Sequence, residues 1–201
     1  MLNKMHLKVF IPAKHTHYMN FYDLLKKRKS VRSYIKEKTV SWKEVAEIID
    51  YANQVPLAGN IPTLNYIIVS EQKKIMQIAD ACQQGFLADV SAIIVVCSRK
   101  EQLLRNFEKK GEMFAHQEAG AAINNMLLAI SEAGMASCWI GHFSDRIIKR
   151  LLKIPKEVEV EAIIPIGYEA PVKLGDRKKA TAKPKIEDTL YFEEWDKNKR
   201  Q

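Results

Sequence analysis

The segment Ser91–Ser98 most constrains what this chain can fold into, because it is apolar on both faces of a strand. A strand without a polar face lies inside a sheet, with other elements covering both sides. Leu64–Val69 and Val158–Gly167 have the length and composition of two further strands, and Ala136–Ile140 of a short one. We therefore expect a small sheet covered by helices, in an α+β or an α/β arrangement that periodicity alone does not distinguish.

Helices are predicted from capping residues and from apolar positions at helical spacing. Ser41 and Glu44 form a capping box, in which a serine hydroxyl and a glutamate three residues later satisfy the free N–H groups of a helix start. The helix that follows places Val45, Ile48, Ile49 and Ala52 on one face. Further helices are expected at Tyr22–Lys29, Glu71–Gln83, Glu112–Gly134, Ser144–Leu152 and Ile186–Trp195.

Composition places the chain among ordinary globular proteins of one domain. It has 201 residues, 47% hydrophobic and 28% charged, and no apolar run approaches the roughly 18 to 20 residues that cross a bilayer. Residues 1–20 lack the continuous apolar core of a signal peptide. The three cysteines form no metal-binding or redox pair, which predicts reduced, buried thiols and a cytoplasmic location.

The sharpest local motif is Arg28-Lys29-Ser30-Val31-Arg32-Ser33-Tyr34, directly after the first predicted helix. Two guanidinium groups four positions apart suit a phosphate, since each forms bidentate, charge-assisted hydrogen bonds and the serine hydroxyl between them adds another. The alternative is a basic helix end that only complements the helix dipole. Taken alone, the motif leaves both interpretations open.

Arg-x-Ser-x-Arg-x-Tyr after an N-terminal helix resembles the opening motif of the nitroreductase family, whose members bind FMN. Four later segments resemble those of the family in the same order. They are its proline loop at Val55–Pro62, its long small-residue helix at Gln117–Leu128, the segment after that helix at Ala136–Gly141, and its last core strand at Ile163–Tyr168. The resemblance covers roughly residues 19 to 195.

The resemblance implies an α+β fold with three α/β/α layers, a central, mostly antiparallel sheet and an intertwined homodimer. Each dimer would hold two FMN sites, and each site would be built from both chains. One FMN-binding domain would cover residues 19–201, after an N-terminal extension at 1–18. Its C-terminal tail would embrace the partner.

By resemblance, the phosphate end of FMN would be held by basic residues from two places in the chain. Arg28, Ser30 and Arg32 would hold the ribityl phosphate or the nearby pyrimidine edge, and Lys29 would contribute its backbone. In the tail, a basic pair separated by one residue would reach the phosphate, which Lys183 and Lys185 fit. Arg177 and Lys178 are the alternative pair.

The flavin ring would be contacted by two loops. Asn60 would hydrogen-bond the ring, and Pro56, Leu57 and Ala58 would pack on it from the partner subunit. Ile140 and Gly141 would lie near N5 and O4, where a backbone N–H bonds the reactive edge. The loop departs from the family pattern, because Asn60-Ile61-Pro62 lacks the usual glutamine. The stretch between Ser98 and Glu112, which shapes the substrate pocket in relatives, is short.

The resemblance implies an oxidoreductase that passes hydride from NADH or NADPH through FMN to an acceptor in a ping-pong cycle. The acceptor would be a nitroaromatic, a quinone or another flavin, and the protein would supply position and electrostatics. We expect no catalytic protein side chain and no metal. Trp139 and Cys138 are interpreted as core packing, and His116 as structural, without a carboxylate partner.

Two rival functions remain. Family variants use the same scaffold for reductive dehalogenation or for cleavage of the flavin itself. Alternatively, the net charge of +8 and the basic stretch from Lys173 to Lys185 suit a non-catalytic protein that binds flavin or a polyanion such as RNA. No aromatic and glycine pattern typical of RNA binding accompanies these charges, and we expect no membrane partner.

Overall fold

The computed structural model describes residues 19–171 and 183–195. The chain divides into two compact units, one up to Ala170 and one from Pro171 onward. The first unit holds the sheet and every α-helix of the described residues. Among these residues, no helix is both long enough and apolar enough to cross a membrane.

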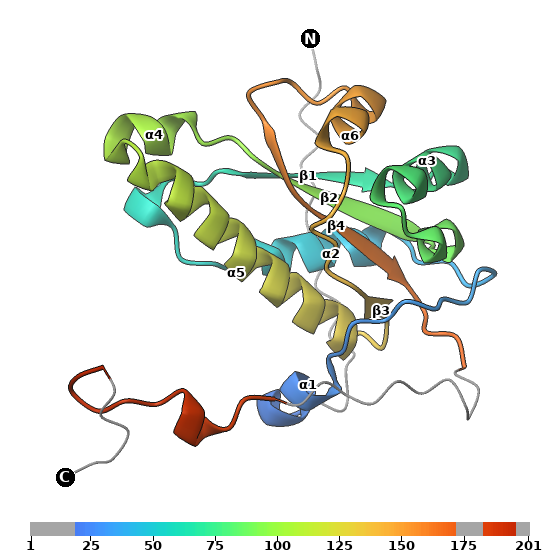
Figure 1. Cartoon of the computed structure of the whole chain (residues 1–201). Coiled ribbons are helices and arrows are strands. Elements are labelled where there is room, and N and C mark those ends of the chain that lie inside the picture. Colours follow the sequence, from blue (N-terminus) through green and yellow to red (C-terminus); the bar gives the residue numbers. More distant parts are fainter. Residues whose placement is uncertain (1–18, 172–182, 196–201) are drawn as a thin grey trace. The chain divides into compact units, whose positions relative to one another are not determined.

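Four strands form one antiparallel sheet in the order β1-β2-β4-β3 (Figure 1). They are β1 (Leu64–Val69), β2 (Ala92–Ser98), β3 (Ala136–Ser137) and β4 (Glu159–Gly167). The four predicted strands are confirmed within one residue at most ends, and β2 is central and buried along its whole length. β3 alone differs by more than one residue, because Ile140 makes an isolated bridge to Ile163 instead of continuing the strand.

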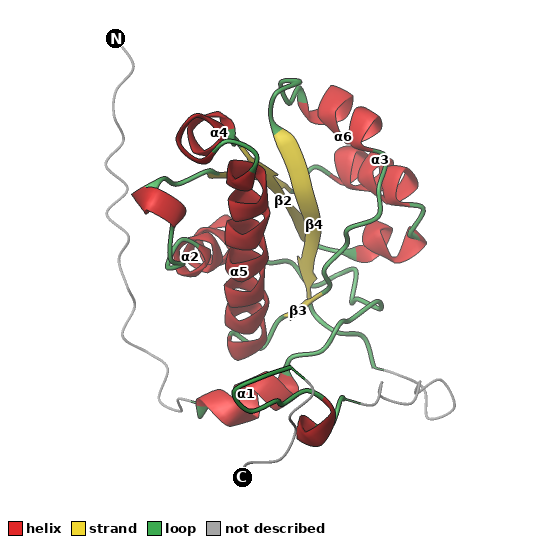
Figure 2. Ribbon diagram, turned by 60° about the vertical axis from the view of Figure 1, so that its left-hand side comes forward, coloured by secondary structure: helices red, strands yellow, loops and turns green. Residues whose placement is uncertain are grey.

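Helices cover both faces of this sheet, as Figure 2 shows. On one face lie α2 (Trp42–Ala52) and α5 (Lys110–Glu132), and on the other α3 (Gln72–Cys82) and α6 (Asp145–Leu152). The side chains of β2 alternate between the two layers of core, with Ala92, Ile94 and Val96 on the α2–α5 side and Ile93, Val95 and Cys97 on the α3–α6 side. The expected three-layer α+β fold is therefore confirmed.

The helix ends follow the local signals in most places. Ser41 and Glu44 form the complete capping box at the start of α2. Gly134 has φ of +73° just beyond α5, a left-handed conformation that glycine adopts without steric cost. Ser144 is the N-cap of α6 by position, but its side chain makes no capping hydrogen bond, so the prediction that it caps this helix is only half right.

Two short helices differ from what the sequence predicted. The first, α1 (Phe21–Lys27), ends two residues before its predicted boundary, where Arg28 leaves the helical conformation. The second, α4 (Glu101–Phe107), lies in a stretch for which no helix was predicted. Only Leu103 of α4 is buried, and the apolar residues Leu103, Leu104 and Phe107 are too few to produce a clear periodic signal.

The second unit, described over residues 183–195, corrects one prediction. Ile186–Trp195 is not a helix, because only the single 3-10 turn Ile186–Asp188 forms there. Ile186, Leu190 and Trp195 are all exposed. A ten-residue helix is marginal in water unless an apolar face is buried against other elements, and these side chains have no such cover.

Candidate functional site

The backbone of Ser30–Ile35 is held between two strands of the sheet. Ser30 pairs with Ser137 of β3, and Tyr34 pairs with Glu169 just beyond β4. The hydrogen bonds run from Val31 N–H to Ser137 O at 2.9 Å, from Ile35 N–H to Tyr168 O at 2.9 Å and from Ala170 N–H to Ser33 O at 3.0 Å. The basic motif therefore lies on a segment that the sheet positions, not on a free helix end.

Tyr34 anchors this segment from the inside. Its side chain is buried, and its hydroxyl donates to the carbonyl of Val31 at 2.9 Å. Burial raises the pKa of the Tyr34 hydroxyl far above its ordinary value, so the group stays protonated. A Cβ at Gly167 would lie 2.9 Å from the Tyr34 ring, so β4 has to carry glycine here to let the tyrosine approach. Tyr34 is a structural residue of the motif.

A cavity of about 320 Å³ opens beside the motif, at the C-terminal end of α5. Its walls include Arg28 and Lys29 from the motif, Ser131 from α5, Ser137 from β3, and Glu169. The volume lies at the lower end of the range found for small-molecule sites. Cations and hydroxyl groups thus converge on one hollow next to the sheet.

The cations around this cavity differ in their partners. Lys29 pairs with Glu169 at 2.7 Å. Arg28 is half-buried and Arg32 is exposed, and no acidic side chain of residues 19–171 or 183–195 forms an ion pair with either. The C-terminal end of a helix such as α5 carries partial negative charge and does not help to bind an anion. Arg28 on the cavity wall, and Arg32 four residues further along the motif, are therefore the two unpaired arginines available to a phosphate.

The second predicted group of residues lies elsewhere in the chain. Pro56, Leu57 and Ala58 precede or begin a 3-10 turn, Ala58–Asn60, in which Gly59 and Asn60 both have positive φ. The turn packs beside α4, since Ala58 and Ile61 share a small core with Leu103, Phe107, Phe114 and Ala115. This core lies at the N-terminal end of α5, whereas the cation-lined cavity lies at the C-terminal end.

The length of α5 keeps these two groups apart in one chain. Ala115 packs beneath the turn and Ser131 lines the cavity. With a rise of about 1.5 Å per residue, these two positions lie about 24 Å apart along the helix axis. The structure of one chain therefore does not bring Arg28 and Asn60 into one site.

The predictions for the segment after β3 agree with the structure only in part. The N–H of Ile140 donates to Ile163 O at 3.1 Å and Ile140 O accepts from the N–H of Ile163, so both polar groups of Ile140 are engaged in the sheet. Gly141 is exposed. Cys138 is buried as predicted, but Trp139 is 44% exposed, so its interpretation as a core residue is wrong. The indole lies 3.9 Å from where a Cβ on Gly120 would stand, on the surface of α5.

The tail residues cannot be related to this site. Lys183 and Lys185 are exposed in the second unit, directly before the turn Ile186–Asp188. Arg177 and Lys178, the alternative pair, lie outside the described residues. The assignment of tail cations to a phosphate stays a prediction.

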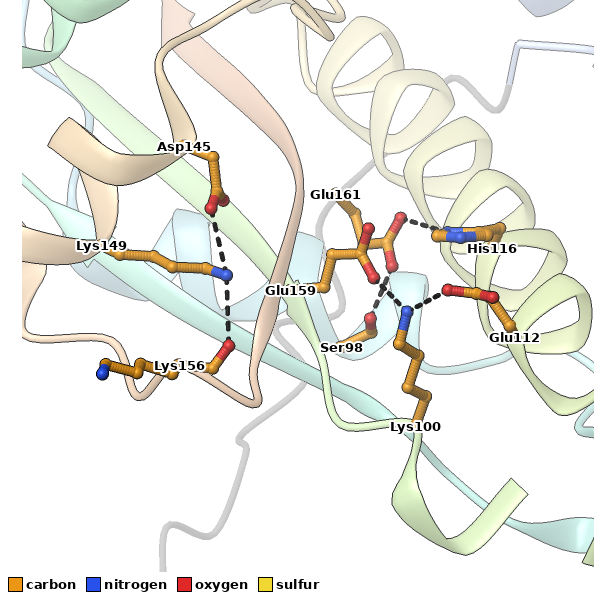
Figure 3. Close-up of polar contacts among 9 residues, drawn as sticks. All are labelled: Ser98, Lys100, Glu112, His116, Asp145, Lys149, Lys156, Glu159 and Glu161. Carbon is orange, nitrogen blue, oxygen red and sulfur yellow. Dashed lines mark hydrogen bonds and ion pairs between the residues drawn. The ribbon is translucent and has the colours of Figure 1, made fainter. Parts of the chain in front are cut away.

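His116 corrects another prediction, because it does have a carboxylate partner. Its Nδ1 lies 2.9 Å from Oε2 of Glu161 on β4 (Figure 3). This hydrogen bond raises the pKa of His116, and the neighbouring Lys100 lowers the pKa of Glu112. The partner was missed because it is 45 residues away in the sequence, although Glu112, one helical turn before His116, was visible as a first hint.

The cysteines offer no reactive thiol. Cys82, Cys97 and Cys138 are free and buried. Burial raises the pKa of both Cys82 and Cys97 to about 11, so these thiols stay protonated and poorly nucleophilic at neutral pH. The expected reduced, buried cysteines are confirmed.

Comparison with known proteins agrees with the fold and the order of motifs. The sequence profile of the nitroreductase family matches residues 25–91 and 78–168. A protein of Archaeoglobus fulgidus described as an NADH dehydrogenase or NAD(P)H nitroreductase is 28% identical over 146 residues, covering 70% of this chain and 80% of its own length. An iodotyrosine deiodinase of Thermotoga neapolitana is 27% identical over 163 residues, covering 73% of this chain and 87% of its own.

Among solved structures, an FMN-dependent nitroreductase of Clostridium difficile superposes with a TM-score of 0.69 at 25% identity. The match covers 86% of this chain and 98% of that one. The profile match includes the turn at Asn60 and the cavity residues Arg28, Lys29, Ser131 and Ser137. The chain is an oxidoreductase scaffold of known type, and it belongs to the nitroreductase family.

Proposed function

We propose that this chain binds FMN as a homodimer and works as an NAD(P)H-dependent flavin oxidoreductase. The observation that carries the proposal is the basic motif, in which Arg28 lines a cavity and Arg32 lies on the sheet-bound segment, and neither has an acidic partner in the described residues. Free guanidinium groups on a rigid backbone suit the dianionic phosphate of FMN. The FMN-dependent relative of known structure supports the same cofactor.

The residues of this chain would bind and orient the cofactor. Arg28 and Arg32 would hold the phosphate, and the exposed Ser30 hydroxyl would donate a further hydrogen bond. When bound, FMN would supply the transfer of hydride from NADH or NADPH to a nitroaromatic, a quinone or another flavin. The exposed Gly141 is the residue of the Ile140–Gly141 pair with a backbone open to the reactive edge of the ring.

A second copy of the chain would complete the site. The distance of about 24 Å along α5 prevents Pro56, Leu57, Ala58 and Asn60 from reaching a flavin held by Arg28 of the same chain. An antiparallel partner would bring its own turn to that position. The exposed side chains of Phe21, Tyr22 and Leu25 on α1 are apolar surface that such an interface would cover.

The reductant is proposed from a relative, and the cellular compartment from the cysteines. The relative from Archaeoglobus fulgidus is described as using NADH or NAD(P)H, which supports a nicotinamide reductant. Three free, buried cysteines suit the reducing conditions of the cytoplasm, where we expect the protein to work.

An absorbance experiment tests the proposal. The purified full chain is incubated with FMN, desalted, and mixed with NADH or NADPH without oxygen. We expect a retained flavin spectrum, one FMN per chain in a dimer by light scattering, and bleaching on addition of the nicotinamide. A folded dimer that retains no FMN would overturn the proposal and favour the polyanion-binding alternative, which a strongly salt-dependent affinity for RNA would reveal.

Reductive dehalogenation is a second candidate, favoured by the match to an iodotyrosine deiodinase over 87% of that enzyme's length. Iodide release from iodotyrosine by the reduced, FMN-loaded protein measures this activity directly. Nitroaromatic or quinone reduction with no iodide released would assign the chain to the nitroreductase activity.

A further inference from the structure

A cluster of ionisable side chains gathers at the N-terminal end of α5, away from the cation-lined cavity. Glu112 and His116 project from successive turns of α5, and Glu159 projects from β4. Their ligand atoms all lie within 4.8 Å of one another. Figure 3 shows Glu112 and Glu159 turned toward the ammonium of Lys100, and His116 beside them turned toward Glu161. Imidazole and carboxylate groups on two rigid elements are typical of a divalent transition-metal site.

An irregularity in β4 aims one more side chain at this place. Val96 pairs with Ala162 and Cys97 with Val160, so Glu161 is an extra residue on β4 at this point. A bulge of this kind redirects a side chain, and such bulges are frequent beside functional sites. Glu161 reaches His116 across the gap between sheet and helix, with a side chain only 9% exposed.

Both oxygens of the Glu161 carboxylate have hydrogen-bond partners. Oε1 accepts from the hydroxyl of Ser98 at 2.5 Å, while Oε2 contacts Nδ1 of His116 at 2.9 Å. Histidines that bind metal usually donate the N–H of their other ring nitrogen to a carboxylate, which sets the tautomer and the ring orientation. In the tautomer that carries the proton on Nδ1, the Ser98–Glu161–His116 chain has this form, and Nε2 would be the nitrogen that binds a metal.

The charge of the cluster also favours a divalent cation. Glu112, Glu159 and Glu161 surround a single ammonium, that of Lys100, which contacts Glu112 and lies 2.6 Å from Glu159. Three carboxylates with one cation leave an excess of two negative charges when His116 is neutral. The ammonium of Lys100 already occupies the position between these carboxylates that a bound metal ion would take.

We propose that Glu112, His116 and Glu159 form a binding site for a divalent transition metal such as Zn²⁺, with Glu161 positioning His116. The metal replaces the Lys100 ammonium, whose partly exposed side chain turns out into solvent. An open hollow lined by Lys109, Glu112, Met113, His116 and Gln117 gives the ion its path from solvent to Glu112 and His116. The site would tie α5 to β4 in every chain, independently of FMN.

Titration calorimetry with ZnCl₂ on the metal-free, FMN-loaded full chain at pH 8 tests the site. His6, His15 and His17 lie outside the described residues and are further candidate ligands for the same ion, so all variants are made in a background with His6→Gln, His15→Gln and His17→Gln. We expect one Zn²⁺ per chain in this background. His116→Gln and Glu112→Gln each lower the affinity by at least about tenfold, and Glu161→Gln lowers it by about 10- to 100-fold.

Two further variants separate a metal site from unspecific binding. Lys100→Gln removes the competing ammonium, so it should bind Zn²⁺ more tightly than the background protein. Glu101→Gln, an exposed carboxylate on the neighbouring α4, is the matched control and should leave the affinity unchanged. Circular dichroism confirms that each variant is folded. No stoichiometric binding, or binding that His116→Gln and Glu112→Gln leave intact, would overturn the proposal.

Discussion

The two ends of α5 carry opposite charge, and they differ in how that charge is satisfied. At the C-terminal end, Arg28 and Arg32 have no acidic partner among the described residues. At the N-terminal end, Glu112 and Glu159 share the ammonium of Lys100. Charges that the fold leaves unpaired are available to a ligand, whereas charges that pair across elements also hold the fold together. One helix thus lies beside unpaired cations at one end and beside a paired cluster with an excess of negative charge at the other.

The largest expected effect comes from a core substitution in the middle of α5, the helix that supports both ends. Ile123 lies in the middle of α5 and is 1% exposed in the core between α5 and the sheet. Ile123→Ala should lower the free energy of unfolding by about 2–5 kcal/mol, because it leaves a cavity under the helix. Urea unfolding at a fixed protein concentration measures the loss.

Ile68→Ala is the matched control, since Ile68 is 39% exposed on the edge strand β1. It should cost clearly less than Ile123→Ala. Equal losses at the two positions would mean that α5 is not the common support of both ends.

The next effect concerns ligand binding alone. Arg28→Ala should weaken FMN binding by about ten- to a hundredfold, as one charge-assisted hydrogen bond contributes about 1.5–3 kcal/mol. The unfolding midpoint should stay close to that of the unaltered protein, because Arg28 has no acidic partner whose charge would be left unpaired. Quenching of flavin fluorescence gives the dissociation constant.

Lys26→Ala serves as its control, because Lys26 lies on the same helix but stacks on the ring of Tyr22 outside the cavity. FMN affinity that falls equally in both variants would show general attraction by positive charge, not a phosphate contact at Arg28.

A substitution at the other end should affect the fold more than cofactor binding. A Cβ at Gly111 would lie 2.4 Å from the carbonyl of Leu103, where α4 meets the start of α5. Gly111→Ala should therefore cost about 1–3 kcal/mol of stability through overpacking. The FMN affinity of the folded fraction should fall less than in Arg28→Ala, because the turn that packs on α4 would contact only the ring of the partner's flavin. Gly85→Ala, where a Cβ meets nothing within 4 Å, is the control for thermal unfolding.

The smallest effect tests the partial pairing of Lys29. Glu169→Gln removes the carboxylate 2.7 Å from the Lys29 ammonium. An exposed pair of this kind contributes about 0.2–1 kcal/mol, so FMN should bind up to about fivefold more tightly once Lys29 is released. Glu157→Gln, an exposed carboxylate outside the cavity, should have no such effect. Weaker binding in Glu169→Gln would place the phosphate away from Lys29.

Much of the fold was predictable from local pattern. Each face of β2 is apolar and each face is covered, and the capping box at Ser41 begins α2 at the expected residue. The errors have a common cause. In α4 only Leu103 is buried, Trp139 has apolar neighbours in sequence but faces solvent, and Ile186–Trp195 has apolar residues without a core to pack on. Periodicity reports which residues prefer burial, not whether a surface exists to bury them.

The sequence by itself determined the elements, the family and the cationic motif, because each depends on residues close together in the chain. Only the tertiary structure decided that Glu161, on a bulge of β4, meets His116 of α5, and that Arg28 and Asn60 lie at opposite ends of one helix. Contacts between distant residues depend on strand register and on how helices pack across a sheet. Neither is encoded in any short stretch of the chain.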